Sequence, residues 1–159
     1  MNEFKKVPQS WRELSIAQQC VLFCAAEETF LLGVLAEWEP QGDWKHRSAS
    51  IPLLAEATES LIRVEFIEVY VQQIPGDAAF LHTDEAIAVI KNPESWWHGE
   101  DDDDPSAGTE DRTVVIYNLL LTEKGADILQ TRGNDPLYTW HDDNTAADTE
   151  AGAEEAAAP

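Results

Sequence analysis

Residues Ser50 to Tyr70, SIPLLAEATESLIRVEFIEVY, constrain the fold more than any other stretch of the chain. Their first half places apolar residues at helical spacing, with Ser50 as the expected N-cap and Pro52 in the first turn, where a missing amide costs little. From Ile62 to Val71 the pattern changes to β-branched and aromatic residues with charged residues between them, which predicts a strand. A helix that passes directly into a strand indicates an α+β fold.

Two more helices are expected ahead of this stretch, which makes three before the strand. The first begins at Leu14, where Ser15 and Gln18 have the S-x-x-Q spacing of a capping box. The second follows Thr29 and ends at Pro40, because proline cannot continue a helix. The polar residues after it are expected to form a connector.

A second strand is predicted at TVVIYNLLL, Thr113–Leu121, which is apolar on both faces and should pair antiparallel with the first. About forty residues separate the two strands, far more than a hairpin loop needs. Within them Thr83 as N-cap and Asn92-Pro93 as a stop signal predict a further helix. We therefore expect a small antiparallel sheet with a helical insertion between its strands.

The closing stretch YNLLLTEKGADIL resembles the strand, L-T-x-x-G, helix segment of MarR- and PadR-type winged-helix proteins, here through Leu121, Thr122 and Gly125. Together with the order of the elements, the resemblance covers the chain from Leu14 to Arg132. It implies a winged helix, that is, a three-helix bundle plus a small antiparallel sheet. It also implies DNA binding through the third helix and the wing, the usual function of these proteins.

The expected organisation has three parts. Residues 1–13 are predicted to be a flexible lead-in, and residues 14–133 a winged-helix-like domain. Within this domain residues 73–111 are the wing insertion, which ends in an acidic loop at 99–111. Residues 134–159 are predicted to be an acidic, alanine-rich, disordered tail.

The charge of the chain is strongly negative, with 10 Lys and Arg against 31 Asp and Glu. Gly99–Asp111 carries seven of these acids and His141–Pro159 carries six, so 18 acids and 10 bases remain elsewhere, a net charge of −8. Such a surface repels DNA and anionic membranes, because binding them depends on Lys and Arg. It favours solubility or a basic protein partner, although an acidic bias of the whole proteome, as in salt-adapted organisms, would look the same.

The residues at the expected DNA-binding positions also have the wrong charge. Glu56 and Glu59 stand where proteins that read bases place Arg, Lys, Asn or Gln. Direct DNA binding by the monomer is therefore not expected, and a homodimer that combines the bases of two subunits is the alternative. Four candidate DNA-binding residues lie near this surface: Lys45, His46, Arg47 and Arg63.

The stretch SWWHGEDDDD has three interpretations. Trp96 and Trp97 could cover the core beneath the inserted helix, or one of them could be an exposed anchor at a protein interface. Cation binding is the third, but the aspartate run lacks the alternating D-x-D-x-D-G spacing of a calcium loop. The candidate protein-interaction residues are Glu56, Glu59, Trp96, Trp97, Asp101, Asp102, Asp103 and Asp104.

No catalytic, metal or cofactor site is predicted. The sequence has no G-x-S-x-G, no glycine-rich phosphate loop and no H-E-x-x-H motif. Its histidines are scattered without the H-x₃₋₅-H spacing of a zinc site. Cys20 and Cys24 follow a helical apolar pattern, so we expect both in the core as small apolar side chains.

A cytoplasmic location is expected. No apolar run approaches the roughly 20 residues that span a bilayer. The first residues, MNEFKKVPQSWREL, lack the apolar stretch of a secretory signal.

These observations lead to a functional hypothesis. We expect a non-enzymatic regulatory or accessory protein that binds a protein with a basic surface, and that imitates DNA in the sharper version of the hypothesis. One alternative is a winged-helix transcription regulator that binds DNA. A second is a structural component of a phage or another assembly.

Overall fold

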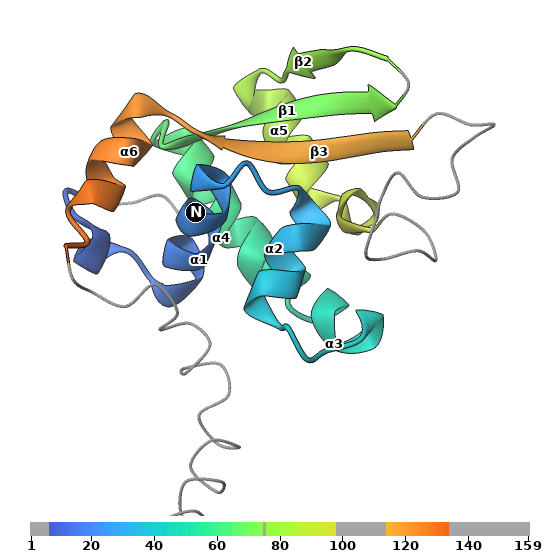
Figure 1. Cartoon of the computed structure of the whole chain (residues 1–159), viewed down its shortest axis with the longest axis horizontal. Helices are drawn as coiled ribbons and strands as arrows, with labels where there is room; N and C mark the ends of the chain where they lie inside the picture. The colour runs from blue at the N-terminus through green and yellow to red at the C-terminus, as the bar shows by residue number, and fades with distance from the viewer. Residues whose placement is uncertain (1–6, 75, 98–113, 134–159) are drawn as a thin grey trace, which may run out of the picture.

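The architecture is α+β in the computed structural model, which describes residues 7–74, 76–97 and 114–133. Over these residues the chain forms six α-helices and a small three-stranded antiparallel sheet (Figure 1). The acidic loop at 99–111, with Asp101, Asp102, Asp103 and Asp104, and the tail at 134–159 lie outside the described residues. The predicted fold class is confirmed at the level of α+β with a small antiparallel sheet.

The folded region begins earlier than expected. A short 3₁₀ helix covers Trp11–Glu13, and the Trp11 side chain is buried in the core. The Trp11 N–H donates to Thr131 Oγ1 at 2.8 Å, which ties the two ends of the domain together. The predicted lead-in is therefore too long, because an aromatic side chain within it packs into the core.

Helix α1 spans Ile16–Ala26 and confirms the capping box. The Ser15 hydroxyl accepts from the Gln18 N–H at 3.1 Å, and the Ser15 N–H donates to Gln18 Oε1 at 2.7 Å. Cys20 and Cys24 are both buried free thiols, as predicted. Burial and the neighbouring Cys24 thiol raise the pKa of Cys20 far above its ordinary range.

Helix α2 spans Leu31–Trp38, and the polar connector after it contains a short helix that was not predicted, α3, at Trp44–Ser48. The Asp43 carboxylate caps α3 by accepting from the His46 N–H at 3.0 Å. Helix α4 follows at Ile51–Arg63 and buries Leu54, among other residues, against the rest of the core. Its N-cap Ser50 makes no side-chain capping bond.

The junction between α4 and the first strand lies later than predicted. The strand was expected from Ile62, but Ile62 is buried within α4, and strand β1 covers Ile67–Ile74. Helix α4 ends in a Schellman arrangement, in which the Phe66 N–H donates to Leu61 O at 2.9 Å and the Glu65 N–H to Ile62 O at 3.0 Å. Burial of Ile62 on the helix outweighs the strand preference of its branched side chain.

The sheet has the order β2-β1-β3. Strand β3, Val114–Leu121, pairs antiparallel with β1 from Ile67↔Leu121 to Ile74↔Val114, so the predicted pairing is confirmed. Strand β2, Ala78–Phe80, is an edge strand that the sequence did not indicate, because it is only three residues long. An isolated bridge also joins Phe30, just before α2, to Asn118 of β3.

Helix α5 lies between β2 and β3 in the chain, at Thr83–Lys91. His82 is its N-cap in place of the predicted Thr83, and the His82 N–H donates to Glu85 Oε1 at 3.0 Å. A 3₁₀ turn at Pro93–Trp96 follows. Helix α6, Glu123–Gln130, begins at the predicted cap, since the Thr122 hydroxyl accepts from the Gly125 N–H at 3.0 Å.

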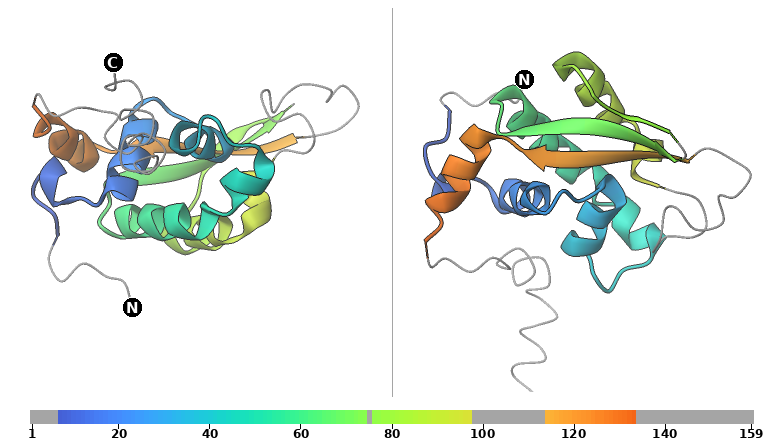
Figure 2. Two further views of the ribbon diagram at one scale, coloured as in Figure 1. Left: turned by 90° about the horizontal axis from the view of Figure 1, so that it is seen from below. Right: turned by 45° about the horizontal axis from the view of Figure 1, so that its top comes forward.

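The helices α1 to α4 lie on one side of the sheet (Figures 1 and 2). Leu22, Leu35, Leu54 and Leu119 meet in the core between the two layers. At the end of the sheet α6 approaches the α4–β1 junction so closely that a Cβ on Gly125 would lie 2.1 Å from Phe66 O. Within the described residues no helix is both long and apolar enough to cross a membrane.

Candidate protein-interaction surface

The exposed face of α4 carries both of the glutamates expected there. Leu53 is 50% exposed, Glu56 is exposed and Glu59 is half-buried one turn further on. The Glu59 carboxylate forms ion pairs with Arg63 at 2.8 Å and with Lys91 of α5 at 3.3 Å. Partial burial raises the pKa of Glu59, but the hydrogen bonds from Arg63 and Lys91 outweigh burial and hold the pKa below its ordinary value.

Helix α5 packs against α4 (Figure 2), and its Lys91 forms an ion pair with Glu59 of α4. A helix that reads bases must enter a major groove about 12 Å wide, and a single helix with side chains already fills most of that width. Because α5 packs beside α4, the two helices together are wider than that groove.

The four candidate DNA-binding residues do not form one basic surface. Arg47 donates from Nε to Glu39 O at 3.0 Å and from Nη2 to Pro40 O at 3.3 Å, which caps the end of α2. The His46 ring contacts the Asp43 carboxylate at 2.7 Å, and both His46 and Lys45 are exposed. Arg63 lies at the other end of α4, about 18 Å along the helix axis from Ile51.

The two tryptophans of SWWHGEDDDD have different environments. Trp96 is fully buried, and its Nε1 donates to Ile90 O at 2.8 Å. It is therefore a core residue, and its interpretation as an interaction anchor is wrong. Trp97 is 42% exposed and lies against Trp44 of α3, with ring centroids 5.9 Å apart. Only Trp97 remains an exposed candidate anchor.

A groove of about 630 Å³ lies between the N-terminal half of α4 and the end of α5. We call it the tryptophan groove. Its charged lining residues are Glu56, Glu59 and Lys91, and Lys91 pairs with Glu59. It is lined by Trp44, Ser48, Ile51, Pro52, Ala55, Glu56, Glu59, Lys91 and Pro93.

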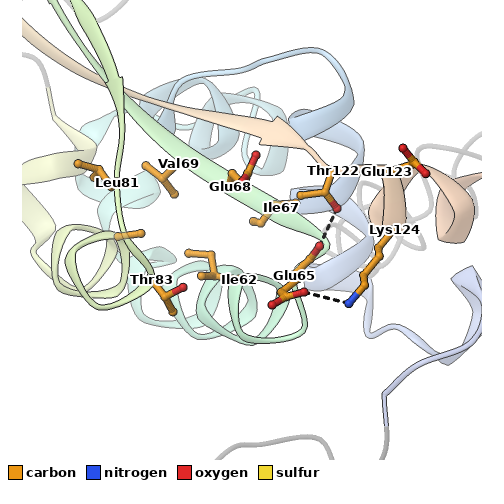
Figure 3. A pocket seen from close by; sticks show the side chains of 11 residues that line it. Ile62, Glu65, Ile67, Glu68, Val69, Leu81, Thr83, Thr122, Glu123 and Lys124 are labelled. Carbon is orange, nitrogen blue, oxygen red and sulfur yellow. Dashed lines mark hydrogen bonds and ion pairs between the residues drawn. The ribbon is translucent and has the colours of Figure 1, made fainter.

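A second groove, of about 440 Å³, lies at the other end of α4, between β1, α5 and the start of α6 (Figure 3). We call it the carboxylate groove, because Glu65, Glu68 and Glu123 line it against one lysine, Lys124. Its apolar lining comes from Ile62, Ile67, Val69, Leu81 and Ala86, and Thr83 and Thr122 complete it.

Glu65 has an unusual backbone at the rim of this groove. Its φ is +65°, a left-handed conformation that Gly normally occupies at the end of a helix. Its carbonyl accepts from Thr122 Oγ1 at 2.6 Å, and its carboxylate lies 2.9 Å from Lys124 Nζ (Figure 3). The hydrogen bond from Lys124 lowers the pKa of Glu65.

The three carboxylates of this groove were missed at the level of sequence. Glu65 and Glu68 appear there only as polar interruptions of a strand pattern, and Glu123 as the residue after a helix cap. The alternation of Glu68 between buried Ile67 and Val69 does indicate an outward position. No local signal places Glu123 at the same groove, because its position depends on the packing of α6 against the α4–β1 junction.

The described part of the chain contains no group of His, Cys, Asp and Glu side chains placed to hold a metal ion. No family model, no curated protein and no solved structure significantly matches this chain.

Proposed function

We propose that this chain is a non-enzymatic regulatory or accessory protein that binds another protein through an acidic surface on a modified winged helix. The order of the elements supports this fold proposal: α1, α2 and α4 precede β1, and β1 pairs with β3 as the strands of a wing would. In this proposal β2 and α5 form a helical insertion between the wing strands.

One observation carries the proposal. The exposed face of α4 presents Glu56 and Glu59, and the one basic residue on this helix, Arg63, is bound by Glu59. Phosphate contacts by Lys and Arg supply most of the nonspecific affinity for DNA. A helix whose one base is already paired with a glutamate offers no unpaired cation to a phosphate, and the net negative charge of the chain attracts a cationic surface.

In its more specific form, the proposal is that the acidic surface imitates the phosphates of DNA. It would then bind to the nucleic-acid-binding site of another protein. Two properties then follow. The complex weakens as salt rises, because the contacts are screened within about 10 Å at 0.1 M ionic strength. Duplex DNA competes for the same partner.

The test is a pull-down with the full chain immobilised, followed by elution with salt and, separately, with duplex DNA. We expect a basic, nucleic-acid-binding partner that both treatments release. A partner that resists salt and is not displaced by DNA would remove the DNA-imitation form. Recovery of no partner from the native host would remove the proposed function.

A further inference from the structure

We propose that a hollow beside the edge strand β2 binds an arginine side chain of an extended partner segment, which adds to the sheet along β2. This inference rests on the proposed function, because it needs a partner with basic residues, and it assigns that partner a place on the molecule. We call the site the aromatic hollow. It has a volume of about 230 Å³ and is lined by Glu28, Tyr70, Ala78, Ala79, Phe80 and Leu120.

The first reason is exposed apolar surface. Tyr70 follows the buried Val69 in β1, so its side chain lies on the face of the sheet away from the core. Phe80 of β2 pairs with Tyr70, is 60% exposed, and has its ring centroid 5.8 Å from that of Tyr70. Ala78 and Ala79 are exposed as well. A partner can therefore reach the apolar surface of this hollow directly.

The second reason is a carboxylate without a cation. Glu28 is exposed, and the Tyr70 hydroxyl donates to its Oε2 at 3.4 Å. No Lys, Arg or His among the described residues forms an ion pair with Glu28, and the three strands of the sheet contain no Lys or Arg. Burial and the charge of Glu28 raise the pKa of Tyr70. A cation of a partner would therefore meet an uncompensated negative charge here.

The backbone holds Glu28 in position. Its φ of +53° is a left-handed conformation that few residues other than Gly adopt. The turn that ends α1 fixes it, since the Glu28 N–H donates to Ala25 O and the Thr29 N–H to Cys24 O, both at 3.0 Å. The carboxylate thus projects from a hydrogen-bonded turn, so less backbone freedom is lost when a partner binds.

These features select arginine among the side chains of a partner. Its apolar stem can pack on the two rings, and its guanidinium is attracted to aromatic faces. The planar guanidinium also matches the geometry of a carboxylate. An acidic side chain would be repelled by Glu28, and an apolar one would leave this carboxylate without a cation.

The third reason is an open strand edge. Over the described residues β2 is the outermost strand of the sheet (Figure 1). The Leu81 N–H donates to Val69 O at 2.9 Å, so Leu81 and every second residue before it face β1. Ala78 and Phe80 therefore direct their N–H and C=O groups to the open side, and both residues are exposed. An extended segment can add there by main-chain hydrogen bonds.

The direction of addition fixes which groups of the partner are used. In an antiparallel pair, residues opposite each other point to the same face of the sheet. An arginine opposite Ala78 then shares the face of Tyr70 and Phe80, and its own N–H points to β2. The N–H of the next residue of the segment points away from β2.

The experiment uses the full chain and a fluorescent peptide, acetyl-Gly-Thr-Val-Arg-Val-Thr-Gly-amide, followed by anisotropy at low salt. A second peptide has citrulline in place of arginine, which keeps the shape of the side chain and removes its charge. We expect the first peptide to saturate the protein and the second to bind about tenfold more weakly, because the contacts with the rings and with the carboxylate both depend on the charge.

Two further peptides test the strand addition. One carries an N-methyl group on the arginine, and the other carries it on the valine that follows. We expect the first to lose binding, because its methyl group replaces a hydrogen bond to β2, and the second to bind as the unmodified peptide does. The reverse result, or equal binding of the two, would contradict antiparallel addition to β2.

The charge of the hollow is tested with Glu28→Gln. The matched control is Glu27→Gln, which removes the same charge one residue earlier, from an exposed side chain outside the hollow. We expect about fivefold weaker binding of the arginine peptide by Glu28→Gln. Glu27→Gln should bind it as the wild type does, and the citrulline peptide should not distinguish the two variants.

The apolar contact is tested with Phe80→Ala, and its matched control is Leu53→Ala. Both substitutions remove a large side chain that is at least half exposed, so neither should change the melting temperature noticeably. We expect Phe80→Ala to weaken binding of the arginine peptide about fivefold, through the lost contact with the ring. Leu53→Ala should leave it unchanged.

Several outcomes would overturn the proposal. They are equal binding of the arginine and citrulline peptides, equal effects of Glu28→Gln and Glu27→Gln, and no saturation of the wild type up to about 1 mM peptide. Another occupant would also overturn it. Self-association that is lost in Phe80→Ala would identify a second copy of the chain. Tighter peptide binding after deletion of residues 1–6, which include Lys5 and Lys6, would identify the chain's own segment.

A variant that combines Glu28→Gln with Phe80→Ala separates this inference from the proposed function. If it recovers the partner of the wild type equally well in the pull-down, the docking site is wrong and the proposed function stands. If the wild type recovers no partner, the proposed function fails, and the peptide titration still reports on the hollow by itself.

Discussion

The two grooves that border α4 differ in how their charges are used. In the tryptophan groove Glu59 is bound by Arg63 and Lys91, so much of the negative charge is neutralised within the protein. In the carboxylate groove one lysine faces three glutamates, and it pairs with only one of them. A count of acids along the sequence does not distinguish these cases. The charge that a partner meets depends on which carboxylates are already paired.

The 3₁₀ turn at Pro93–Trp96, next to the tryptophan groove, gives the largest expected effect on stability. Replacement of Trp96 by alanine removes a fully buried ring and its hydrogen bond to Ile90 O, so we expect a loss of about 3–5 kcal/mol in the free energy of unfolding. Trp97→Ala is the matched control and should cost less than about 1 kcal/mol, since that ring is 42% exposed. Urea unfolding measures both, and equal losses would contradict the assignment of one ring to the core and the other to the surface.

At the carboxylate groove the packing of α6 is the sensitive point. In Gly125→Ala the added Cβ would lie 2.1 Å from the backbone oxygen of Phe66, so α6 must shift away from the α4–β1 junction. We expect a loss of about 1–3 kcal/mol in the free energy of unfolding, typical of an overpacked contact. Unchanged stability would show that α6 does not approach the junction as closely as described.

Two substitutions of Glu65, at the same groove, separate the effect of backbone strain from the effect of charge. Glu65→Gly and Glu65→Gln both remove the carboxylate, but only glycine accepts the φ of +65° without a steric cost. We expect the glycine variant to melt a few degrees above the glutamine variant. A glutamine variant that melts at or above the glycine variant would show that this backbone position carries no strain.

The smallest expected effect concerns pH and the tryptophan groove. The folded-state pKa of Glu59 is depressed, so its ion pairs stabilise the protein above the ordinary pKa of about 4.3, and this stabilisation is lost as pH falls through the lower folded value. Between pH 7 and pH 3 the wild type should therefore lose about 0.5 kcal/mol more than Glu59→Gln. Parallel pH profiles of the two proteins would contradict the assigned pairing.

Sequence reasoning succeeded where the signal is local. The capping box of Ser15 and Gln18 and the cap at Thr122 both depend on residues three apart, and both are present as expected. The pairing of β1 with β3 was also predictable, because two apolar strands in a short chain must share a core.

Prediction from the sequence failed where the structure is determined by packing between elements that are far apart in the chain. Ile62 has a β-branched side chain, which is typical of strands, but it completes the buried face of α4. Strand β1 therefore begins later than predicted. Trp96 and Trp97 are adjacent and identical, so no sequence pattern could assign one to the core and the other to the surface. The carboxylate groove required the position of α6, which brings Glu123 close to residues far away in the chain.

The central claim is that this acidic chain does not bind a polyanion, and titration of a labelled DNA duplex with the full chain at low salt tests it most directly. Since even nonspecific DNA-binding proteins reach dissociation constants of about 10⁻⁴ to 10⁻⁶ M at physiological salt, binding at lower salt would be readily detected. We predict no change in anisotropy at about 10 μM protein, a concentration at which such proteins bind. Salt-dependent binding at that concentration, weakened by Arg63→Gln or Lys45→Gln, would contradict the account and support the DNA-binding regulator in its place.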